Sequence, residues 1–443
     1  MDRQAETFKR MNNLAIVILV GFLLVAASLL FWSIIRAPAL LLREDNPRLV
    51  EAELRIQRGK ILDRNGMILA ETMGQANDLV RTYPLPHIGH AVGYYSFRHG
   101  TAGVEDGYDS VLRGDSEAFG TEYVRQSLHQ PQIGQDIQLS LDTHVQETAV
   151  SLLNNHTGAI ILLDNLTGEL IAMASNPSYD PNELDTQFED LIENETAPLL
   201  NRAVQGSYQP GLVLQPFIVA WALENEIISL DETVPNANEE LLIGNQFMTC
   251  LTPPPQPTTW RDILLHRCPA PMQDLANKIG KAGLDATFSA FGFARNPNLP
   301  LDTETTLSEP VQDPLLAGVG QDTQIITPIQ LALAWSSLAQ NGQAPLPWLV
   351  TAIQEDDEWQ PILPETDEPI TAVSAQTAQT IRDLLQYYAI PVLSGPDGTT
   401  NSWFFGFSPE QNPRYTAVVV LENRPSVQEV ETIGQTLLNE VTK

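Results

Sequence analysis

A short turn that leads into an apolar helix, GSYQPGLVLQPFIVAWALE at residues 206–224, has the form of a catalytic loop at the head of a buried helix. Pro216 stands where the first turn of a helix tolerates proline. Side chains one turn apart at such a helix head lie on one face, so a nucleophile and its base could act together there. These two positions hold Leu212 and Gln215. Neither side chain can serve as a nucleophile or as a base, so the segment predicts a helix without chemistry of its own.

The charge of the whole chain limits its partners. The 443 residues include 55 acidic and 24 basic side chains, a formal net charge of −31. Such a charge opposes binding of the folded body to nucleic acid or to anionic lipid. We therefore expect no nucleic-acid partner and interpret the charge as a solvated acidic surface. The hydrophobic fraction of 43% supports globular cores, and the length allows two or three domains.

An uncharged run at residues 14–35 is long enough to cross a membrane, which takes about 20 helical residues. Basic residues precede the run and no small-residue cleavage site closes it. This pattern predicts an uncleaved transmembrane helix with residues 1–13 as a cytoplasmic tail. The protein is then a single-pass protein of the cell membrane, with its bulk outside the cytoplasm.

Cys250 and Cys268 are the only cysteines, and an even pair in an oxidising compartment favours a disulfide that closes a proline-rich loop. Two separate buried thiols are the alternative. His87 and His90 form the closest histidine pair, but no cysteine or carboxylate cluster joins them. We predict no metal site and no cofactor.

Apolar runs along the second half of the chain predict an α+β domain. Strands and helices come in groups and do not alternate, which favours an antiparallel sheet covered by helices. The expected elements are a strand passing into a helix at 136–153, two strands at 158–175 joined at 165–168, the opening helix, helices at 272–279 and 328–338, and a hairpin of strands at 402–407 and 415–421. Residues 354–369, rich in Asp, Glu and Pro, are expected to be exposed, whereas Asn65-Gly66 predicts an earlier hairpin.

Several segments resemble, in order, class B penicillin-binding proteins, the membrane-anchored D,D-transpeptidases that cross-link peptidoglycan. They are RGKILDRNG at 58–66, the segment 89–114, GELIAMASNPSYDPN at 168–182, the segment 318–342, and WFFGFSPEQNPRYTAVVVLEN at 403–423. The resemblance implies a transpeptidase-like domain of the serine β-lactamase and penicillin-binding-protein fold at residues 151–443. A non-catalytic pedestal at 36–150 would connect it to the anchor.

The chemistry of that family rests on three motifs, S-x-x-K, S-x-N and K-T-G, which supply a nucleophile, its base, a proton relay and a cation for the substrate carboxylate. All three are degenerate in this chain. In the first motif, the resemblance places Leu212 at the serine and Gln215 at the lysine. In the second motif, it places Arg267 at the serine and Pro269 at the asparagine. The third motif reads Pro396, Asp397 and Gly398, and Thr399 follows it.

The lysines test this degeneracy without an alignment. The chain has five, and none has a serine three positions before it, so no S-x-x-K tetrapeptide exists anywhere. A shift of register cannot restore the first motif. The five are Lys9, Lys60, Lys278, Lys281 and Lys443.

These observations predict a pseudoenzyme that serves as scaffold or regulator in peptidoglycan synthesis, within an elongation or division complex. In the family, the anchor and pedestal are where a membrane glycosyltransferase docks. The resemblance therefore implies the membrane as one partner, a peptidoglycan glycosyltransferase or an active penicillin-binding protein as another, and peptidoglycan itself as a further one.

Two alternatives stay open. An active D,D-transpeptidase could use Ser207 or Thr399 as its nucleophile, although no lysine base is predicted beside either. A non-catalytic receptor for peptidoglycan or peptide could use Arg267 to meet a carboxylate, with Gly398 and Thr399 as further binding positions. Because the second and third motifs face each other in the family, we also predict that Arg267 and Asp397 pair across the cleft.

Overall fold

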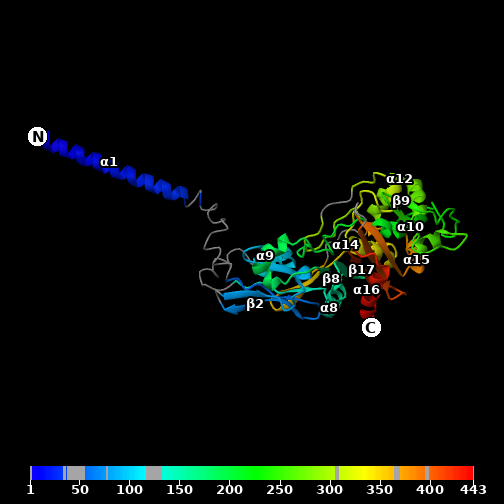
Figure 1. Ribbon diagram of the computed structural model, residues 1–443. Coiled ribbons are helices and arrows are strands. Elements are labelled where there is room, and N and C mark those ends of the chain that lie inside the picture. The colour runs from blue at the N-terminus through cyan, green and yellow to red at the C-terminus, as the bar shows by residue number, and fades with distance from the viewer. Residues whose placement is uncertain are drawn as a thin grey trace. The chain divides into compact units, whose positions relative to one another are not determined.

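The computed structural model describes most of the chain, in two compact units. The described residues are 2–32, 36, 55–75, 78–115, 132–304, 309–363, 370–394 and 399–442. One unit comprises residues 1–57, 73–80 and 119–132, and the other comprises 58–72, 81–118 and 133–443. Helix α1 (Asp2–Leu30) belongs to the first unit, and its window Asn13–Leu30 is long and apolar enough to cross a membrane. This helix is consistent with the predicted single-pass anchor (Figure 1), whose orientation stays a prediction.

A five-stranded antiparallel sheet forms the centre of the second unit. Its order is β15-β16-β17-β7-β8, and every neighbouring pair is antiparallel. The strands are β7 (Gly158–Asp164), β8 (Leu170–Asn176), β15 (Tyr387–Ser394), β16 (Thr399–Ser408) and β17 (Tyr415–Leu421). The predicted pairs of strands are confirmed, whereas β15 was not expected. Pairing of β7 with β17 brings the two ends of this domain together.

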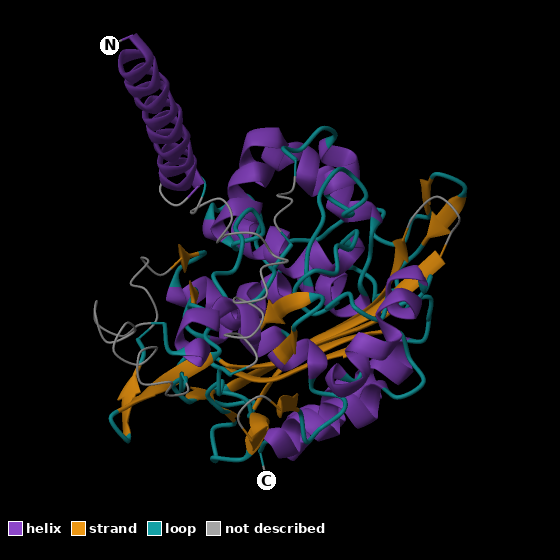
Figure 2. Cartoon of the chain, turned by 90° about the vertical axis from the view of Figure 1, so that its left-hand side faces the viewer, coloured by secondary structure: helices purple, strands orange, loops and turns teal. Residues whose placement is uncertain are grey.

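Helices cover both faces of the sheet (Figure 2). Helix α8 (Thr143–Leu153) and helix α16 (Val427–Glu440) pack on one face, and α14 (Pro328–Ala339) packs on the other. The C-terminus lies at the end of α16 (Figure 1). Strands buried on both faces are nearly continuous apolar runs without alternation, which explains GAIILL before Asp164 in β7. The predicted α+β architecture is confirmed.

Helix α10 (Gln215–Glu224) lies in the centre of the larger hydrophobic core. A single 3-10 turn, η3 (Gly211–Leu214), directly precedes it. It is apolar on all sides, as expected of a helix buried in a domain. Phe217 makes edge contacts with Phe291, Phe293 and Trp335, whose ring centroids lie 5.0, 5.2 and 6.1 Å away. These contacts hold the helix between the sheet and the following helices.

A second sheet joins the pedestal to the later part of the chain. Its order is β13-β12-β6-β1-β2-β3. The strands are β1 (Ile61–Leu62), β2 (Ile68–Gln75), β3 (Asp78–Thr82), β6 (Ile137–Leu139), β12 (Val350–Glu355) and β13 (Glu358–Pro361). Strand β12 pairs with β6 across more than 200 positions of sequence, as in Ile353 with Ile137. Helix α8 spans residue 150, so the predicted domain boundary falls inside a helix.

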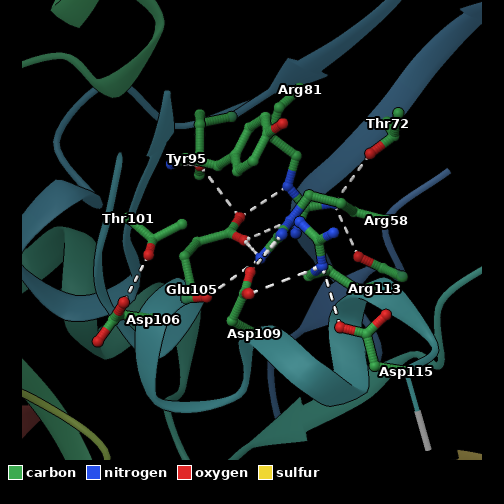
Figure 3. A network of polar contacts seen from close by, with 12 residues as sticks. Arg58, Thr72, Arg81, Tyr95, Thr101, Glu105, Asp106, Asp109, Arg113 and Asp115 are labelled. Atoms are coloured by element: carbon green, nitrogen blue, oxygen red, sulfur yellow. Dashed lines mark hydrogen bonds and ion pairs between the residues drawn. The ribbon is translucent and has the colours of Figure 1, made fainter. Parts of the chain in front are cut away.

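Buried charges hold the pedestal together (Figure 3). Glu105 is fully buried, and its carboxylate accepts hydrogen bonds from Arg81 at 2.7 Å, from Arg58 at 3.0 Å and from the Tyr83 hydroxyl at 3.0 Å. Burial raises the pKa of Glu105, but the Arg81 and Arg58 guanidinium groups outweigh this effect and hold the pKa below its usual value. Arg58 also bonds Asp109 at 2.6 Å.

The remaining elements are short or connect these layers. They are α4 (Gly89–Val92), β4 (Gly93–Ser96), β5 (Gly100–Gly103), α5 (Val104–Gly107), α6 (Asp109–Arg113), η2 (Pro181–Glu183), α9 (Leu184–Glu193), β9 (Leu241–Ile243), β10 (Gln246–Met248), α11 (Trp260–His266), α12 (Ala270–Ala290), α13 (Pro314–Ala317), β11 (Gln343–Ala344), β14 (Ile370–Thr371) and α15 (Ala375–Leu384). Helix α12 extends well past its predicted end, with a break at Gly280, where φ is 75°.

Candidate active site

The turn before α10 packs tightly against the edge strand β15. Gly211 has φ of +52°, and a Cβ at this position would lie 2.6 Å from the side chain of Val392 in β15. Glycine is therefore required both for the left-handed backbone and for the close approach. Pro216 lies in the first turn of α10, as predicted. The turn that precedes α10 is therefore in close contact with strand β15.

Leu212 and Gln215 lie at this helix head, and neither is accessible to solvent. Their exposed fractions are 3% and 0%. The Gln215 amide is fixed by two hydrogen bonds: its Nε2 donates to the Cys268 carbonyl at 3.0 Å, and its Oε1 accepts from the Tyr388 hydroxyl. Both the Nε2 and the Oε1 of this buried amide therefore have a hydrogen-bond partner, as buried polar atoms ordinarily do.

Tyr388 covers the start of α10 on the side that faces the sheet. It lies on β15 and is fully buried. Burial raises the pKa of Tyr388 well above its usual value, and the nearby Arg267 cation lowers it by less, so the phenol stays protonated and can donate to Gln215. Tyr388 was not among the predicted site residues. The apolar run YYAIPVLS, rich in residues that favour strands, was the signal that could have placed a strand there.

Arg267 lies over the Tyr388 ring. Its guanidinium carbon is 4.8 Å from the ring centroid, a cation–π contact. Arg267 caps α11 in the left-handed conformation, with φ of 51°, and its Nη1 donates to the Leu265 carbonyl. Its Nε is buried and has no hydrogen-bond partner within the part of the chain that the structure describes. Pro269 directly precedes α12.

Cys250 and Cys268 form the predicted disulfide. The bridge ties the end of hairpin β9–β10 to the start of α12. It also anchors the residue whose carbonyl accepts from Gln215. The disulfide is thus part of the framework around the helix head.

The third motif lies partly outside the described residues. Pro396, Asp397 and Gly398 belong to the range 395–398, for which the structure gives no description, so the pairing of Arg267 with Asp397 stays a prediction. Thr399 is the first residue of β16 and is exposed; its hydroxyl donates to the Ser394 carbonyl.

The other candidate residues lie apart from a catalytic arrangement. The Ser207 hydroxyl donates to the Glu304 carboxylate at 3.2 Å. His90 is buried, with Nε2 at 3.3 Å from the Pro177 carbonyl, and burial lowers its pKa to about 4, whereas His87 is exposed. Among the described residues no group of three or more His, Cys, Asp or Glu side chains could hold a metal ion.

Comparison with known families agrees with this architecture. The family of the penicillin binding protein transpeptidase domain matches residues 158–391, more than half of the chain, and the penicillin binding protein A dimerisation domain matches residues 58–137. The chain belongs to the penicillin-binding protein transpeptidase family. The predicted family and fold are confirmed, and the second match covers most of the predicted pedestal of this penicillin-binding protein homologue.

The relatives described next align with 69% to 93% of this chain. Peptidoglycan D,D-transpeptidase PbpA from Mycolicibacterium smegmatis is 26% identical over 462 aligned residues, covering 93% of each chain. Peptidoglycan D,D-transpeptidase MrdA from Escherichia coli is 24% identical, covering 69% of this chain and 52% of MrdA. Penicillin-binding protein A from M. tuberculosis, solved as an imipenem acyl-enzyme complex, has a TM-score of 0.79 at 22% identity, covering 88% of this chain and 99% of that one.

Proposed function

We propose that this membrane-anchored penicillin-binding protein homologue does not catalyse transpeptidation and acts as a scaffold or regulator in peptidoglycan synthesis. One observation carries the proposal. The helix head, where the family resemblance places the nucleophile and its base, holds Leu212 and Gln215, and the Gln215 amide is bonded to Tyr388 and to Cys268 in a buried, neutral cluster.

The absence of a nucleophile supports the proposal first. Acyl transfer by a serine enzyme needs an oxygen that can attack a carbonyl and a group that removes its proton. Leu212 has no polar atom, and an amide such as Gln215 does not accept a proton near neutral pH. No S-x-x-K tetrapeptide occurs in the 443 residues, so a different register does not supply one.

The burial of the same positions supports the proposal further. A substrate carbonyl must approach the helix head, but Leu212, Gln215 and Tyr388 expose at most 3% of their surface. Opening the cluster would break the hydrogen bond from Tyr388 to Gln215 and expose apolar surface, both of which cost free energy. Substrate access to this point is therefore opposed by the packing itself.

The role in peptidoglycan synthesis rests on the relatives. PbpA of Mycolicibacterium smegmatis, which is named a peptidoglycan D,D-transpeptidase, aligns over 93% of each chain. A homologue that keeps the anchor, the pedestal and the frame of the transpeptidase domain keeps the parts through which a glycosyltransferase or an active penicillin-binding protein could bind. We place the bulk of the chain outside the cytoplasm, with residues 1–13 inside.

An active transpeptidase is the less supported function. Ser207 and Thr399 are the candidate nucleophiles, but the described partner of Ser207 is a carboxylate and that of Thr399 is a backbone carbonyl. Neither arrangement provides the lysine base that the family uses.

Acylation by penicillin tests the proposal directly. The full chain in detergent is incubated with a fluorescent penicillin, and the intact mass is measured. We expect no adduct, whereas M. tuberculosis penicillin-binding protein A, which has been solved as a penicillin G acyl-enzyme complex, serves as the positive control. A stoichiometric covalent adduct on this chain would refute the proposal, and mapping it to Ser207 or Thr399 would identify the replacement nucleophile.

A receptor function has one observation in its favour. Arg267 keeps a buried Nε without a hydrogen-bond partner in the described part of the chain, beside the sealed helix head. Isothermal titration calorimetry with a peptide that ends in D-Ala-D-Ala tests the receptor function. Saturable binding that Arg267→Gln abolishes would favour a receptor, and absence of binding would leave the scaffold role alone.

A further inference from the structure

Hairpin β9–β10 lies at the end of the domain that contains α10 and α12 (Figure 1). It carries an exposed apolar pair. Leu242 and Phe247 are cross-strand partners, and their side chains are 55% and 68% exposed. The neighbouring Leu241, Ile243 and Met248 pack against the core. One face of the hairpin is therefore buried, and the other presents two large apolar side chains where an antiparallel hairpin ordinarily carries polar ones.

A tight turn and a disulfide define the two ends of the hairpin that carries this pair. Ile243 and Gln246 pair on either side of a two-residue turn, and Gly244 has the positive φ of 56° that tight hairpin turns require. The disulfide of Cys250, which follows β10, fixes its base. A preorganised backbone reduces the conformational entropy that is lost when a partner binds.

The chain segment that carries the pair has charge of a single sign, whereas the Cys250–Cys268 bridge brings Arg267, which lies over the Tyr388 ring, to the base of the hairpin. Between residues 203 and 260 the chain has no Lys, Arg or His, but it has six acidic residues. Glu239 and Glu240 directly precede β9 and are exposed. The flanking cations are occupied, since Arg202 bonds Glu422 at 2.9 Å and Arg261 bonds Asp231 at 3.4 Å.

We propose that the outward face of hairpin β9–β10, defined by Leu242, Phe247, Glu239 and Glu240, is a docking surface for a partner protein segment that presents apolar side chains flanked by Lys or Arg. The apolar pair supplies the buried centre of the contact, and the carboxylates select a cationic rim. This inference rests on the binding role in the proposed function and names the surface that performs it.

The same charges argue against two other occupants. Anionic lipid headgroups would be repelled by Glu239 and Glu240, since membrane attraction works through basic residues. A second copy of this chain, with a net charge of −31, would bring like charges to the same contact. A cationic protein segment is the occupant that these residues favour.

Photo-crosslinking in native membranes tests the occupant. A benzophenone side chain is placed at Phe247 of the full chain, and at Trp359 in a control. Trp359 is also exposed, at 40%, and lies on β13. We expect position 247 to yield a crosslinked peptide from another protein with apolar residues next to Lys or Arg, and position 359 not to yield it. Crosslinks to lipid, to a second copy or to an acidic segment, or none at all, would overturn the proposal.

A binding measurement with a defined probe separates the apolar pair from charge alone. The probe is a synthetic amphipathic peptide of Leu and Lys, and a peptide of Leu and Glu is its control. We expect the double variant Leu242→Ser/Phe247→Ser to bind the Leu-Lys peptide about tenfold more weakly, although its charge is unchanged. The matched double variant Leu166→Ser/Trp359→Ser, whose sites are 74% and 40% exposed in the parent chain, should bind as the parent does.

The carboxylates make a further contribution that salt reveals. Glu239→Gln/Glu240→Gln should weaken binding several-fold at low ionic strength and little at high ionic strength, because exposed charges are screened. Equal binding of the Leu-Glu peptide, or an unchanged affinity of the Leu242→Ser/Phe247→Ser variant, would overturn the proposal. Both outcomes are independent of penicillin acylation, so failure of this inference is distinguishable from failure of the proposed non-catalytic function.

Discussion

The pedestal centre at Glu105 and the helix head at Gln215 are both buried and both hydrogen-bonded, but only the first depends on a buried ion pair. Glu105 lies between Arg58 and Arg81, so a carboxylate is stabilised by two cations (Figure 3). Gln215 lies between a phenol and a backbone carbonyl, with the Arg267 cation placed over the phenol ring and outside the hydrogen bonds.

The difference concerns what each region can do. A buried charge fixes structure as long as its partners remain, and losing one partner leaves the others uncompensated. A neutral amide fixes structure too, but it has no formal charge and does not accept a proton near neutral pH. The pedestal thus has an electrostatic framework, whereas neutral hydrogen bonds and apolar packing hold the helix head. Four substitutions measure this contrast, in order of expected effect.

Glu105→Gln should have the largest effect, a loss of about 3–5 kcal/mol in the free energy of unfolding, because it leaves Arg58 and Arg81 without their shared buried carboxylate. Thermal unfolding of the full chain in detergent measures it. Asp106→Asn changes the adjacent, exposed carboxyl and should have a much smaller effect. Equal losses in the two variants would show that the pedestal charges do not act as described.

The same carboxylate predicts a pH dependence. The folded-state pKa of Glu105 lies below its unfolded value of about 4.3, so its stabilisation is complete above that value and is lost as the pH falls through the folded-state pKa. The parent should lose stability below about pH 4. Glu105→Gln should lose less stability over that interval, and identical pH profiles would contradict the assignment.

Loss of the disulfide should come next. Cys250→Ser/Cys268→Ser removes a bridge between residues 18 positions apart, for which loop entropy gives about 3 kcal/mol. Denaturant unfolding measures the loss, and a reductant should shift the parent but not the variant. If the reductant leaves the parent unchanged, the bridge does not stabilise the framework of the helix head.

Gly211→Ala should destabilise by about 2 kcal/mol, because alanine disfavours the positive φ and its Cβ would meet Val392 of β15. Gly66→Ala is the matched control, since Gly66 has φ of +83° but open space around it. The difference between the two losses measures the packing of the turn against β15. Equal losses would show that backbone strain alone explains the glycine.

Tyr388→Phe should have the smallest effect, about 1–2 kcal/mol, because it leaves the buried Gln215 oxygen without its donor. The double variant Gln215→Leu/Tyr388→Phe removes both partners and should lose less than the sum of the single losses. A double-mutant cycle by denaturant unfolding measures this coupling. Additive losses would show that the two side chains are not bonded in solution.

Local signals explain which parts of the fold were predictable. The strands β7 and β8 are apolar except at their C-terminal ends and are separated by a short polar turn, so both their type and their bounds were visible. The sheet that β12 forms with β6 was not predicted, because pairing over more than 200 positions leaves no local pattern. Pairing between distant strands depends on the register of the whole domain.

The candidate site was likewise predictable only where local sequence carried the signal. Residue types at neighbouring positions are enough to establish that no S-x-x-K motif exists and that Leu212 and Gln215 head an apolar helix. The hydrogen bond between Gln215 and Tyr388, which lies 173 positions away, and the position of Arg267 over the same ring depend on the folded chain. A neutral polar side chain can bond many partners, and the packing of strand against helix selects one of them.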